Sequence, residues 1–138
     1  MGKLDGSCLC GKVTYSCDGE PMAVAVCHCK DCQKQTGTTF SIIVAVPRDA
    51  LQIDWDGLGS FTTVGTDTNQ NVTRMFCPEC GSPVASIADA MPQAAMIKGG
   101  TLDDTSWLEP QMHVWTESAQ AWFPFEGHVD ARLPRGPF

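Results

Sequence analysis

The sequence has no run of about 18 apolar residues, so it offers no segment typical of a membrane-spanning helix. Its first residues, MGKLDGSCLCGK, have neither the hydrophobic core of a signal peptide nor a basic amphipathic presequence. Linkers, internal repeats and low-complexity tracts are also missing from the 138 residues, a length that suits one domain. We therefore expect a single cytoplasmic domain over residues 1–138 that has no membrane partner.

Basic residues are few. The sequence has sixteen acidic residues against nine basic ones, which gives a formal net charge of −7, and its basic residues form no dense cluster. A strongly negative protein is repelled by the phosphate backbone unless a local basic patch compensates. We therefore expect no nucleic-acid partner, and this argues against a chromatin-binding role.

Long helical patterns are missing too, and short β-rich segments recur along the chain. Turn-forming pairs such as Asp18-Gly19, Asp56-Gly57 and Gly99-Gly100 separate these segments, as in an all-β domain. Short helical turns are predicted only over residues 31–36 and 103–107, and the tail over residues 129–138 is expected to run loose or to contact a neighbour. The predicted strands are KVTYSC (12–17), MAVAV (22–26), TFSIIVAV (39–46), LQIDW (51–55), SFTTV (60–64), NVTRMF (71–76), PVASIA (83–88), AAMIKG (94–99) and MHVW (112–115).

Eight cysteines are present, and four of them form two short pairs that each adjoin a glycine. Cys8 and Cys10 lie in CLCGK, and Cys77 and Cys80 lie in CPECG. Neighbours in C-x-C are too close to form an unstrained disulfide readily, whereas two thiolates at that spacing can point at one metal ion. Structural zinc prefers a closed tetrahedron of thiolates. These four cysteines are therefore the predicted ligands of a structural zinc that joins two distant hairpins. Reduced cysteines buried in a core remain the alternative.

Three further cysteines, Cys27, Cys29 and Cys32, lie within CHCKDC. Three thiolates can bind one face of a zinc ion and leave its fourth position open, as in catalytic sites. Three thiolates give the zinc group a net charge near −1, which suits a soft ligand such as a substrate thiol better than water. The alternatives are a second closed site completed by His28 or Cys17, a metal-free redox cluster, and adventitious zinc binding. In an extended segment His28 would point away from its neighbours, and Cys17 fits an ordinary core thiol.

The order of these motifs resembles the glutathione-dependent formaldehyde-activating enzyme family, also called the CENP-V/GFA domain. The resemblance extends from about residue 6 to 122 and includes three segments: CHCKDCQKQTGTTFS (27–41), GGTLDD (99–104) and PQMHVWTESAQAW (110–122). It implies a zinc-containing β-tent fold in which Cys8, Cys10, Cys77 and Cys80 hold the permanent zinc. It also implies that Cys27, Cys29 and Cys32 hold a second, exchangeable zinc where glutathione binds. The implied reaction condenses glutathione with formaldehyde to S-hydroxymethylglutathione and belongs to a carbon-sulfur lyase.

Several other residues are candidates for substrate contacts. Glutathione is an anion, so recognition would need local cations, and Lys30 and Lys34 flank the triplet; both could equally be solvated surface charges. His113 could transfer a proton to the forming alkoxide, although a hydrogen-bonded core histidine is the commoner case. The aromatic residues could line a pocket or pack in the core; they are Phe40, Trp107, Trp115 and Trp122.

The leading hypothesis is a zinc-dependent enzyme acting on a small thiol and an aldehyde, most simply glutathione and formaldehyde. Its rival is a non-catalytic, zinc-stabilised module that sequesters glutathione or its adducts, or that binds a protein partner. No motif specifies the oligomeric state.

Overall fold

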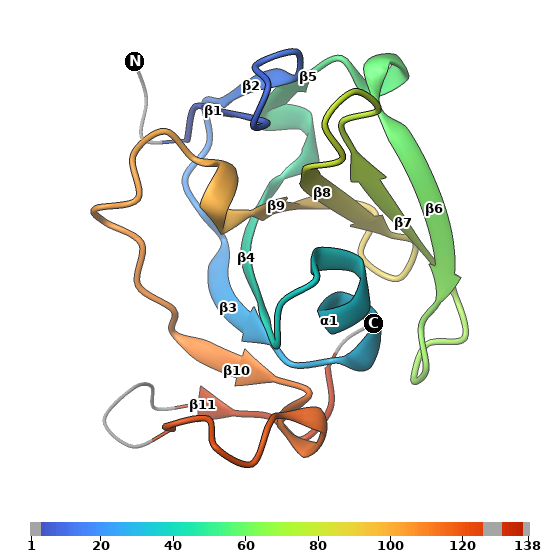
Figure 1. Ribbon diagram of the computed structural model, residues 1–138, viewed down its shortest axis with the longest axis vertical. Coiled ribbons are helices and arrows are strands. Elements are labelled where there is room, and N and C mark those ends of the chain that lie inside the picture. The colour runs from blue at the N-terminus through green and yellow to red at the C-terminus, as the bar shows by residue number, and fades with distance from the viewer. Residues whose placement is uncertain (1–3, 126–130, 137–138) are drawn as a thin grey trace.

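The computed structural model describes residues 4–125 and 131–136, and this part of the chain forms two β-sheets and one short α-helix (Figure 1). The strands are β1 (Gly6–Ser7), β2 (Thr14–Cys17), β3 (Ala23–Cys27), β4 (Ser41–Pro47), β5 (Leu51–Ile53), β6 (Gly59–Val64), β7 (Asn71–Phe76), β8 (Pro83–Ala88), β9 (Ala94–Lys98), β10 (Met112–Val114) and β11 (Ala131–Arg132). The helix is α1 (Lys30–Thr36), and four 3-10 turns are η1 (Arg48–Ala50), η2 (Trp55–Gly57), η3 (Gly99–Thr101) and η4 (Thr116–Ser118). The predicted all-β class is confirmed.

The two sheets differ in size. The smaller has the order β1-β2-β5, and the larger has the order β11-β10-β3-β4-β9-β8-β7-β6. All pairings are antiparallel except those of β10, which runs parallel to β3 on one side and to β11 on the other. Each β-rich segment predicted from the sequence contains one of these strands, because period-two apolar patterning marks half-buried strands well.

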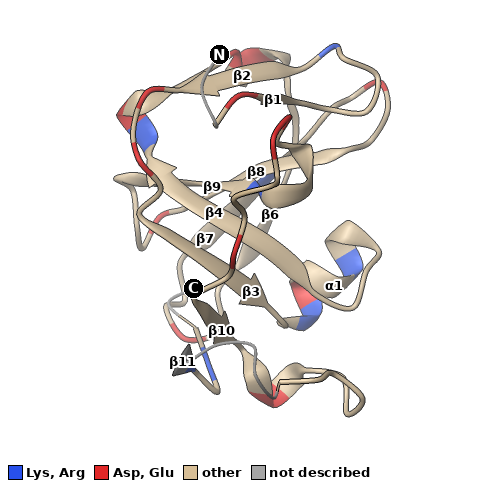
Figure 2. Cartoon of the chain, turned by 90° about the vertical axis from the view of Figure 1, so that its left-hand side faces the viewer, with Lys and Arg blue, Asp and Glu red and all other residues tan. Residues whose placement is uncertain are grey.

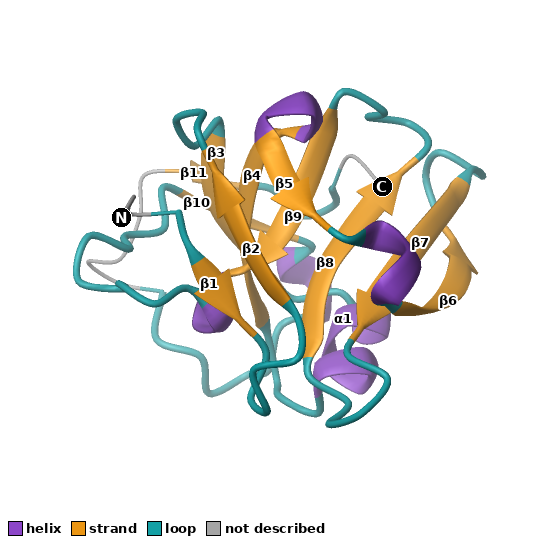
Figure 3. Ribbon diagram, turned by 90° about the horizontal axis from the view of Figure 1, so that it is seen from above, coloured by secondary structure: helices purple, strands orange, loops and turns teal. Residues whose placement is uncertain are grey.

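The larger core lies between the two sheets. Seen from above, the small sheet lies over strands of the large one (Figure 3). Apolar side chains from both sheets meet there, including Tyr15, Leu51, Val44 and Ile97. Successive side chains of a strand point to opposite faces, so the alternate residues of the large sheet face away from this core. That second face carries a smaller cluster with Cys27, Ile43, Val72, Met96 and Val114.

Helix α1 begins at the cysteine motif, as predicted. Cys29 is its N-cap, and the Cys29 sulfur accepts a hydrogen bond from the Cys32 backbone N–H at 3.1 Å. Gly37 ends the helix in the left-handed conformation (φ +73°), which glycine adopts without strain. The second helical turn predicted, over residues 103–107, is not helical. There the Asp104 carboxylate accepts a hydrogen bond from the Ser106 backbone N–H, which stabilises a tight turn instead.

The C-terminal segment packs on its own chain. Residues 126–130, 137 and 138 of the tail lie outside the described residues, but β11 pairs with β10, and the Leu133 N–H donates to the His113 carbonyl at 2.8 Å. Arg135 forms an ion pair with Asp67 at 2.7 Å and stacks over the Trp115 ring. The prediction that this tail runs loose is therefore wrong for residues 131–136, while its contact with a neighbour stays a prediction.

Charged residues are spread over the loops rather than gathered on one sheet face, and α1 carries basic residues with an acidic one between them (Figure 2). Among residues 4–125 and 131–136, no helix has the length and apolar character needed to cross a membrane.

Candidate metal centres and active site

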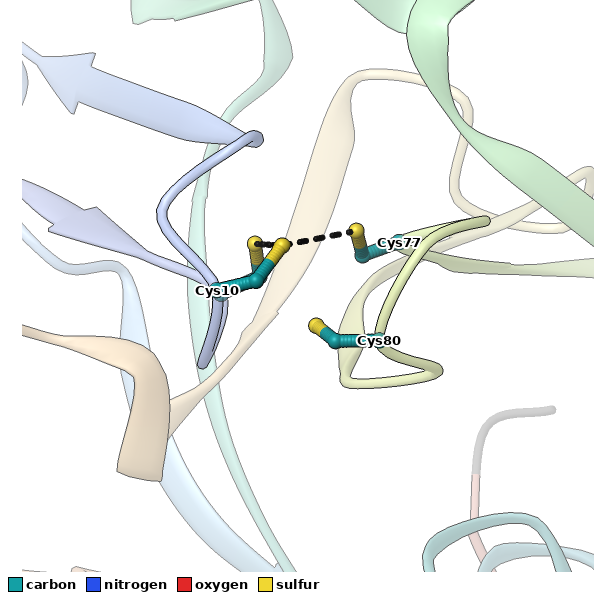
Figure 4. Close-up of side chains that lie close together, drawn as sticks. Cys10, Cys77 and Cys80 are labelled. Atoms are coloured by element: carbon teal, nitrogen blue, oxygen red, sulfur yellow. Dashed lines mark hydrogen bonds between the residues drawn. The ribbon is translucent and has the colours of Figure 1, made fainter.

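The first candidate centre is the four-cysteine site, formed by Cys8 and Cys10 before β2 and by Cys77 and Cys80 between β7 and β8. Their sulfur atoms all lie within 4.8 Å of one another, although the two pairs are far apart in the sequence. The Cys10 sulfur is 3.6 Å from that of Cys8 and 3.7 Å from that of Cys77, and Figure 4 shows the side chains turned toward a common centre. All four are free cysteines.

The four-cysteine site fits a tetrahedral zinc ion. With a Zn–S distance of about 2.3 Å, a regular tetrahedron places its sulfur atoms about 3.8 Å apart, close to the observed separations. Each cysteine pair lies in a tight turn, here called a knuckle, that contains a glycine in the left-handed region, Gly11 (φ +82°) or Gly81 (φ +77°). Hydrogen bonds from the Ser82 side chain and backbone lower the pKa of Cys80 to about 5, which favours the thiolate that a metal requires.

The second candidate centre is the cysteine triplet, Cys27, Cys29 and Cys32. Cys27 ends β3, Cys29 caps α1, and Cys32 lies in its first turn, so one strand-to-helix turn brings the three sulfur atoms within 4.8 Å of one another. Cys27 and Cys32 are fully buried, while Cys29 is partly exposed. The triplet therefore has two enclosed ligand atoms and one on the side that solvent can reach.

Protonation in the triplet is uneven. Hydrogen bonds from Cys27 and Cys29 lower the pKa of Cys32 to about 2, with help from the positive charges of Lys98 and Arg74. Hydrogen bonds to the other two sulfur atoms, together with burial, raise the pKa of Cys27 far above its usual range. The pKa of Cys29 is raised to about 11; its hydrogen bond with Cys27 lowers the value, but the hydrogen bond with Cys32 and burial outweigh it. Three sulfur atoms within 4.8 Å of one another, one of them with a lowered pKa, form a donor set that fits a divalent metal.

Two buried cations beside the triplet were missed in the sequence analysis. Arg74 of β7 lies with its Nη1 atom 3.6 Å from the Cys32 sulfur, and its Nε donates to the Thr63 hydroxyl. Lys98 of β9 donates to the Ser41 hydroxyl at 3.0 Å. Only 4% of the Arg74 surface and 7% of the Lys98 surface are exposed. The available signal was a lysine at the end of the apolar strand AAMIK, because unpaired buried lysine is rare.

These cations change the charge expected at the triplet. Burial lowers the pKa of Lys98, and the negative charges of the cysteines oppose that shift. With Arg74 and Lys98 both charged, they would turn a group of three thiolates and one divalent ion from about −1 to about +1. An anionic ligand would then be attracted to the triplet, in contrast to what its thiolates alone predict.

Two cavities lie near the triplet, and one of them is lined by a triplet cysteine. The smaller, which we call the polar pocket, has a volume of about 160 Å³, and Cys29, Lys30, Asp31, Thr66, Trp115 and Ser118 are among the residues that line it. The larger, which we call the phenylalanine groove, has a volume of about 510 Å³ and lies between α1 and strands β6 and β7. Its walls include Lys34, Gln35, Phe61 and Phe76. Asp31 and Arg74 line both cavities.

The predicted substrate lysines are exposed at the two ends of α1, Lys30 at the polar pocket and Lys34 at the phenylalanine groove. Their contact with a substrate carboxylate stays a prediction. Among the predicted aromatic residues, Trp115 lines the polar pocket, Trp107 packs against the main core, and Trp122 is exposed.

His28 and His113 lie together on the other side of the sheet. In the β3–β10 register Val114 pairs with Cys27 and His113 with Val26, so the His113 side chain points to the face opposite Cys27. His28 Nε2 is 2.8 Å from His113 Nδ1, and both residues are fully buried. The rings of Phe40, Phe123 and Phe125 pack against His28.

The positions of His28, His113 and Cys17 can now be compared with the predictions. His28 points away from its cysteine neighbours, as its place in an extended segment predicted, and it is not part of the cysteine triplet. The His113 ring lies across the sheet from the sulfur atoms. Its proton-transfer role stays a prediction. Cys17 is buried in the main core and belongs to neither metal centre.

Comparison with known proteins gives a consistent result. Residues 3–118 match the family model described as glutathione-dependent formaldehyde-activating enzyme. The match covers most of the chain and includes all the cysteines of both candidate centres.

Individual relatives are more distant. Fungal proteins provisionally named glutathione-dependent formaldehyde-activating enzymes are 27% identical over 120 residues in Phaeosphaeria nodorum, 27% over 113 residues in Penicillium rubens and 30% over 113 residues in Podospora anserina. These alignments cover 85%, 80% and 78% of this chain but 62%, 58% and 52% of the relatives. The chain thus spans little more than half the length of these curated relatives. A crystal structure of a Rhodobacter sphaeroides protein is similar in fold, with a TM-score of 0.57 and 20% identity, over 72% of this chain and 87% of that one.

Proposed function

The chain belongs to the glutathione-dependent formaldehyde-activating enzyme family, and on this premise we propose that it is a carbon-sulfur lyase that condenses a small thiol, glutathione, with formaldehyde. The carrying observation is the cysteine triplet, with one partly exposed sulfur at the polar pocket and the Arg74 guanidinium 3.6 Å from another sulfur. The fungal relatives' names support the same activity. Because the chain spans only part of those relatives, the activity is proposed for this domain alone.

The reaction is an addition without oxidation or reduction. The thiol sulfur forms a bond to the formaldehyde carbon, the carbon-oxygen double bond becomes single, and the thiol proton ends on the oxygen. Cys27, Cys29 and Cys32 would hold a zinc ion, which stabilises the substrate sulfur as a thiolate. Cys8, Cys10, Cys77 and Cys80 would hold a second zinc ion that joins the two sheets.

The chain's own residues would attract and orient the anionic thiol. Arg74 and Lys98 are buried, so little water screens their charges at the triplet. Their hydrogen bonds to Thr63 and Ser41 fix both cations in place. Lys30, at the rim of the polar pocket, is available to a substrate carboxylate. Holding thiol and aldehyde together there would convert a spontaneous bimolecular addition into a faster, oriented one.

A Cys29→Ser variant tests the proposal. We expect it to keep its fold by circular dichroism, to lose one of two bound zinc ions, and to lose the acceleration of thiol-formaldehyde condensation measured against the uncatalysed rate. Cys17→Ser is the matched control, because Cys17 belongs to neither metal centre, and it should keep both zinc ions and the activity.

The same measurements distinguish the proposed enzyme from its rival, a non-catalytic binding module. A protein that binds glutathione or its adduct without accelerating the addition would be a binding module. If Cys29→Ser unfolds while Cys17→Ser does not, the triplet is structural and the enzyme proposal fails. The cytoplasmic location and the lack of a nucleic-acid partner stay predictions.

A further inference from the structure

The phenylalanine groove is too large for the proposed aldehyde. Its volume of about 510 Å³ lies in the range of sites for ligands of drug size, whereas formaldehyde is little larger than a water molecule. The polar pocket, about 160 Å³, already provides space beside Cys29. The groove therefore offers room for a group that formaldehyde does not have.

The groove and the polar pocket share two wall residues beside the triplet. Asp31 and Arg74 line both cavities, and Arg74 also contacts the Cys32 sulfur. The two cavities therefore lie on either side of these two side chains, and a thiol with its sulfur at Cys29 and its arm in the groove would have to pass them. Both sides of the path carry charge, so an arm that runs along it must contain polar atoms near the sulfur.

Farther from the sulfur atoms the groove becomes aromatic. Phe61 on β6 is 66% exposed, which is unusual for a phenylalanine on a paired strand. The Phe76 ring packs over Gly59, where a Cβ atom would lie 2.5 Å from Phe76 Cε2. The ring fits there because Gly59 has no side chain. Together the two rings give the groove an apolar surface that glutathione, which has no apolar side chain, cannot cover.

Two polar groups define what else the arm must carry. The Gln35 Oε1 atom is buried and accepts no hydrogen bond from the residues that the structure describes. A buried acceptor without a donor costs roughly 1–3 kcal/mol. Gln35 itself is only half-buried and lines the groove, so a turn of its amide toward the groove would let a ligand N–H satisfy this acceptor. Lys34 adds an ammonium group that suits a carboxylate.

We propose that the phenylalanine groove is a substrate subsite and that it binds the arm of a peptide-like thiol bearing an aromatic group, an amide N–H and a terminal carboxylate. This inference rests on the proposed function for the sulfur chemistry and adds the class of thiol. The aromatic group packs against Phe61 and Phe76, the amide meets Gln35, and the carboxylate meets Lys34. Glutathione can supply the amide N–H and the carboxylate, but it leaves the Phe61 and Phe76 rings uncovered.

Two peptides of equal charge test the inference: glutathione, which is γ-Glu-Cys-Gly, and γ-Glu-Cys-Phe, which adds one benzyl group. We expect the zinc-loaded protein to use γ-Glu-Cys-Phe with a KM roughly three- to tenfold lower than that of glutathione, the gain from one additional aromatic contact. The S-methyl forms of both peptides cannot react, and their dissociation constants, measured by calorimetry, should show the same preference.

A matched pair of variants tests whether the preference for γ-Glu-Cys-Phe arises in the phenylalanine groove. Phe61→Ser removes the exposed ring and should abolish the preference, whereas Val64→Ser, on the same strand, should preserve it. Val64 is 55% exposed and does not line the groove. Equal affinities for the two S-methyl peptides, or a preference that survives Phe61→Ser, would overturn the inference. A binding preference without any turnover would support the subsite and reject the proposed lyase activity, so the two failures are distinguishable.

Discussion

Arg74 lies with its Nη1 atom 3.6 Å from the sulfur of Cys32, although the two residues are 42 positions apart. The contact joins β7 to the first turn of α1 and places a permanent positive charge against a buried sulfur atom. The negative charge of Cys32 in turn raises the pKa of Arg74, against the effect of burial, which lowers it. This pair links the sheet to the proposed chemistry more directly than any feature recognised in the sequence.

Removing the positive charge of Arg74 should weaken zinc binding at the cysteine triplet. Arg74→Met keeps most of the side-chain volume, and we expect it to lower the affinity of the triplet for zinc by 10- to 100-fold, the usual size of effects from groups that support metal ligands. Competition with a coloured chelator measures that affinity. Arg74→Lys should retain more of it, because it keeps the charge but loses the forked geometry. Equal zinc affinity in both variants and the wild type would contradict the role given to Arg74.

The four-cysteine site should control folding. Cys77→Ser removes one of four ligands, and we expect it to lower the free energy of unfolding by at least about 4 kcal/mol, as loss of a structural metal does. Cys17→Ser changes another buried cysteine outside both centres and should cost only about 1–3 kcal/mol. Urea denaturation with zinc present measures both. Similar losses in the two variants would mean that Cys77 acts only as a core side chain.

Acid should destabilise the protein partly through His28. Burial, together with the charge of His113, lowers the pKa of His28 to about 4, below its ordinary value of 6.5. As pH falls below 6.5 the unfolded chain takes up this proton first, so stability present above 6.5 is lost between 6.5 and about 4, by at most about 3 kcal/mol.

The variant His28→Gln isolates this effect, because the glutamine amide can donate to His113 but does not titrate. Urea denaturation at a series of pH values should show a shallower loss of stability for His28→Gln than for the wild type. The loss caused by thiolate protonation at the metal centres is common to both proteins. Identical slopes would mean that another group carries the acid sensitivity.

The C-terminal segment should resist a side chain at Gly136. A Cβ atom there would lie 2.5 Å from the Nε1 atom of Trp115, so Gly136→Ala must displace either the indole or the segment. We expect a loss of roughly 1–3 kcal/mol and a change in tryptophan fluorescence. Gly100→Ala is the control, because a Cβ atom at Gly100 has no other atom within 4 Å. Equal thermal stability of both variants would show that residues 131–136 shift readily to admit a side chain at position 136.

Much of the local structure could be predicted. Nine of the eleven strands in the described residues lie in segments that alternating or continuous apolar residues predicted, whereas the two-residue strands β1 and β11 were not predicted. The C-x-C and C-x-x-C pairs each adjoin a glycine, and these glycines, Gly11 and Gly81, have positive φ angles. The direction of the His28 side chain, away from its cysteine neighbours, followed from the two-residue period of extended chain. The helical turn expected over residues 103–107 did not form, because the Asp104 carboxylate accepts a hydrogen bond from the Ser106 backbone N–H and stabilises a tight turn instead.

The sequence by itself determined the elements whose interactions are local: the strands, the knuckles, and a triplet of thiolates in one strand-to-helix turn. Only the tertiary structure decided which distant side chains join them. The register of β4 with β9 pairs Ile43 with Lys98 and lets Lys98 reach Ser41, and the pairing of β6 with β7 sets Arg74 beside Thr63 and near Cys32. Strand register is fixed by the packing of the whole sheet, so the buried cations, the phenylalanine groove and the His28–His113 pair emerge only when all the strands are in place.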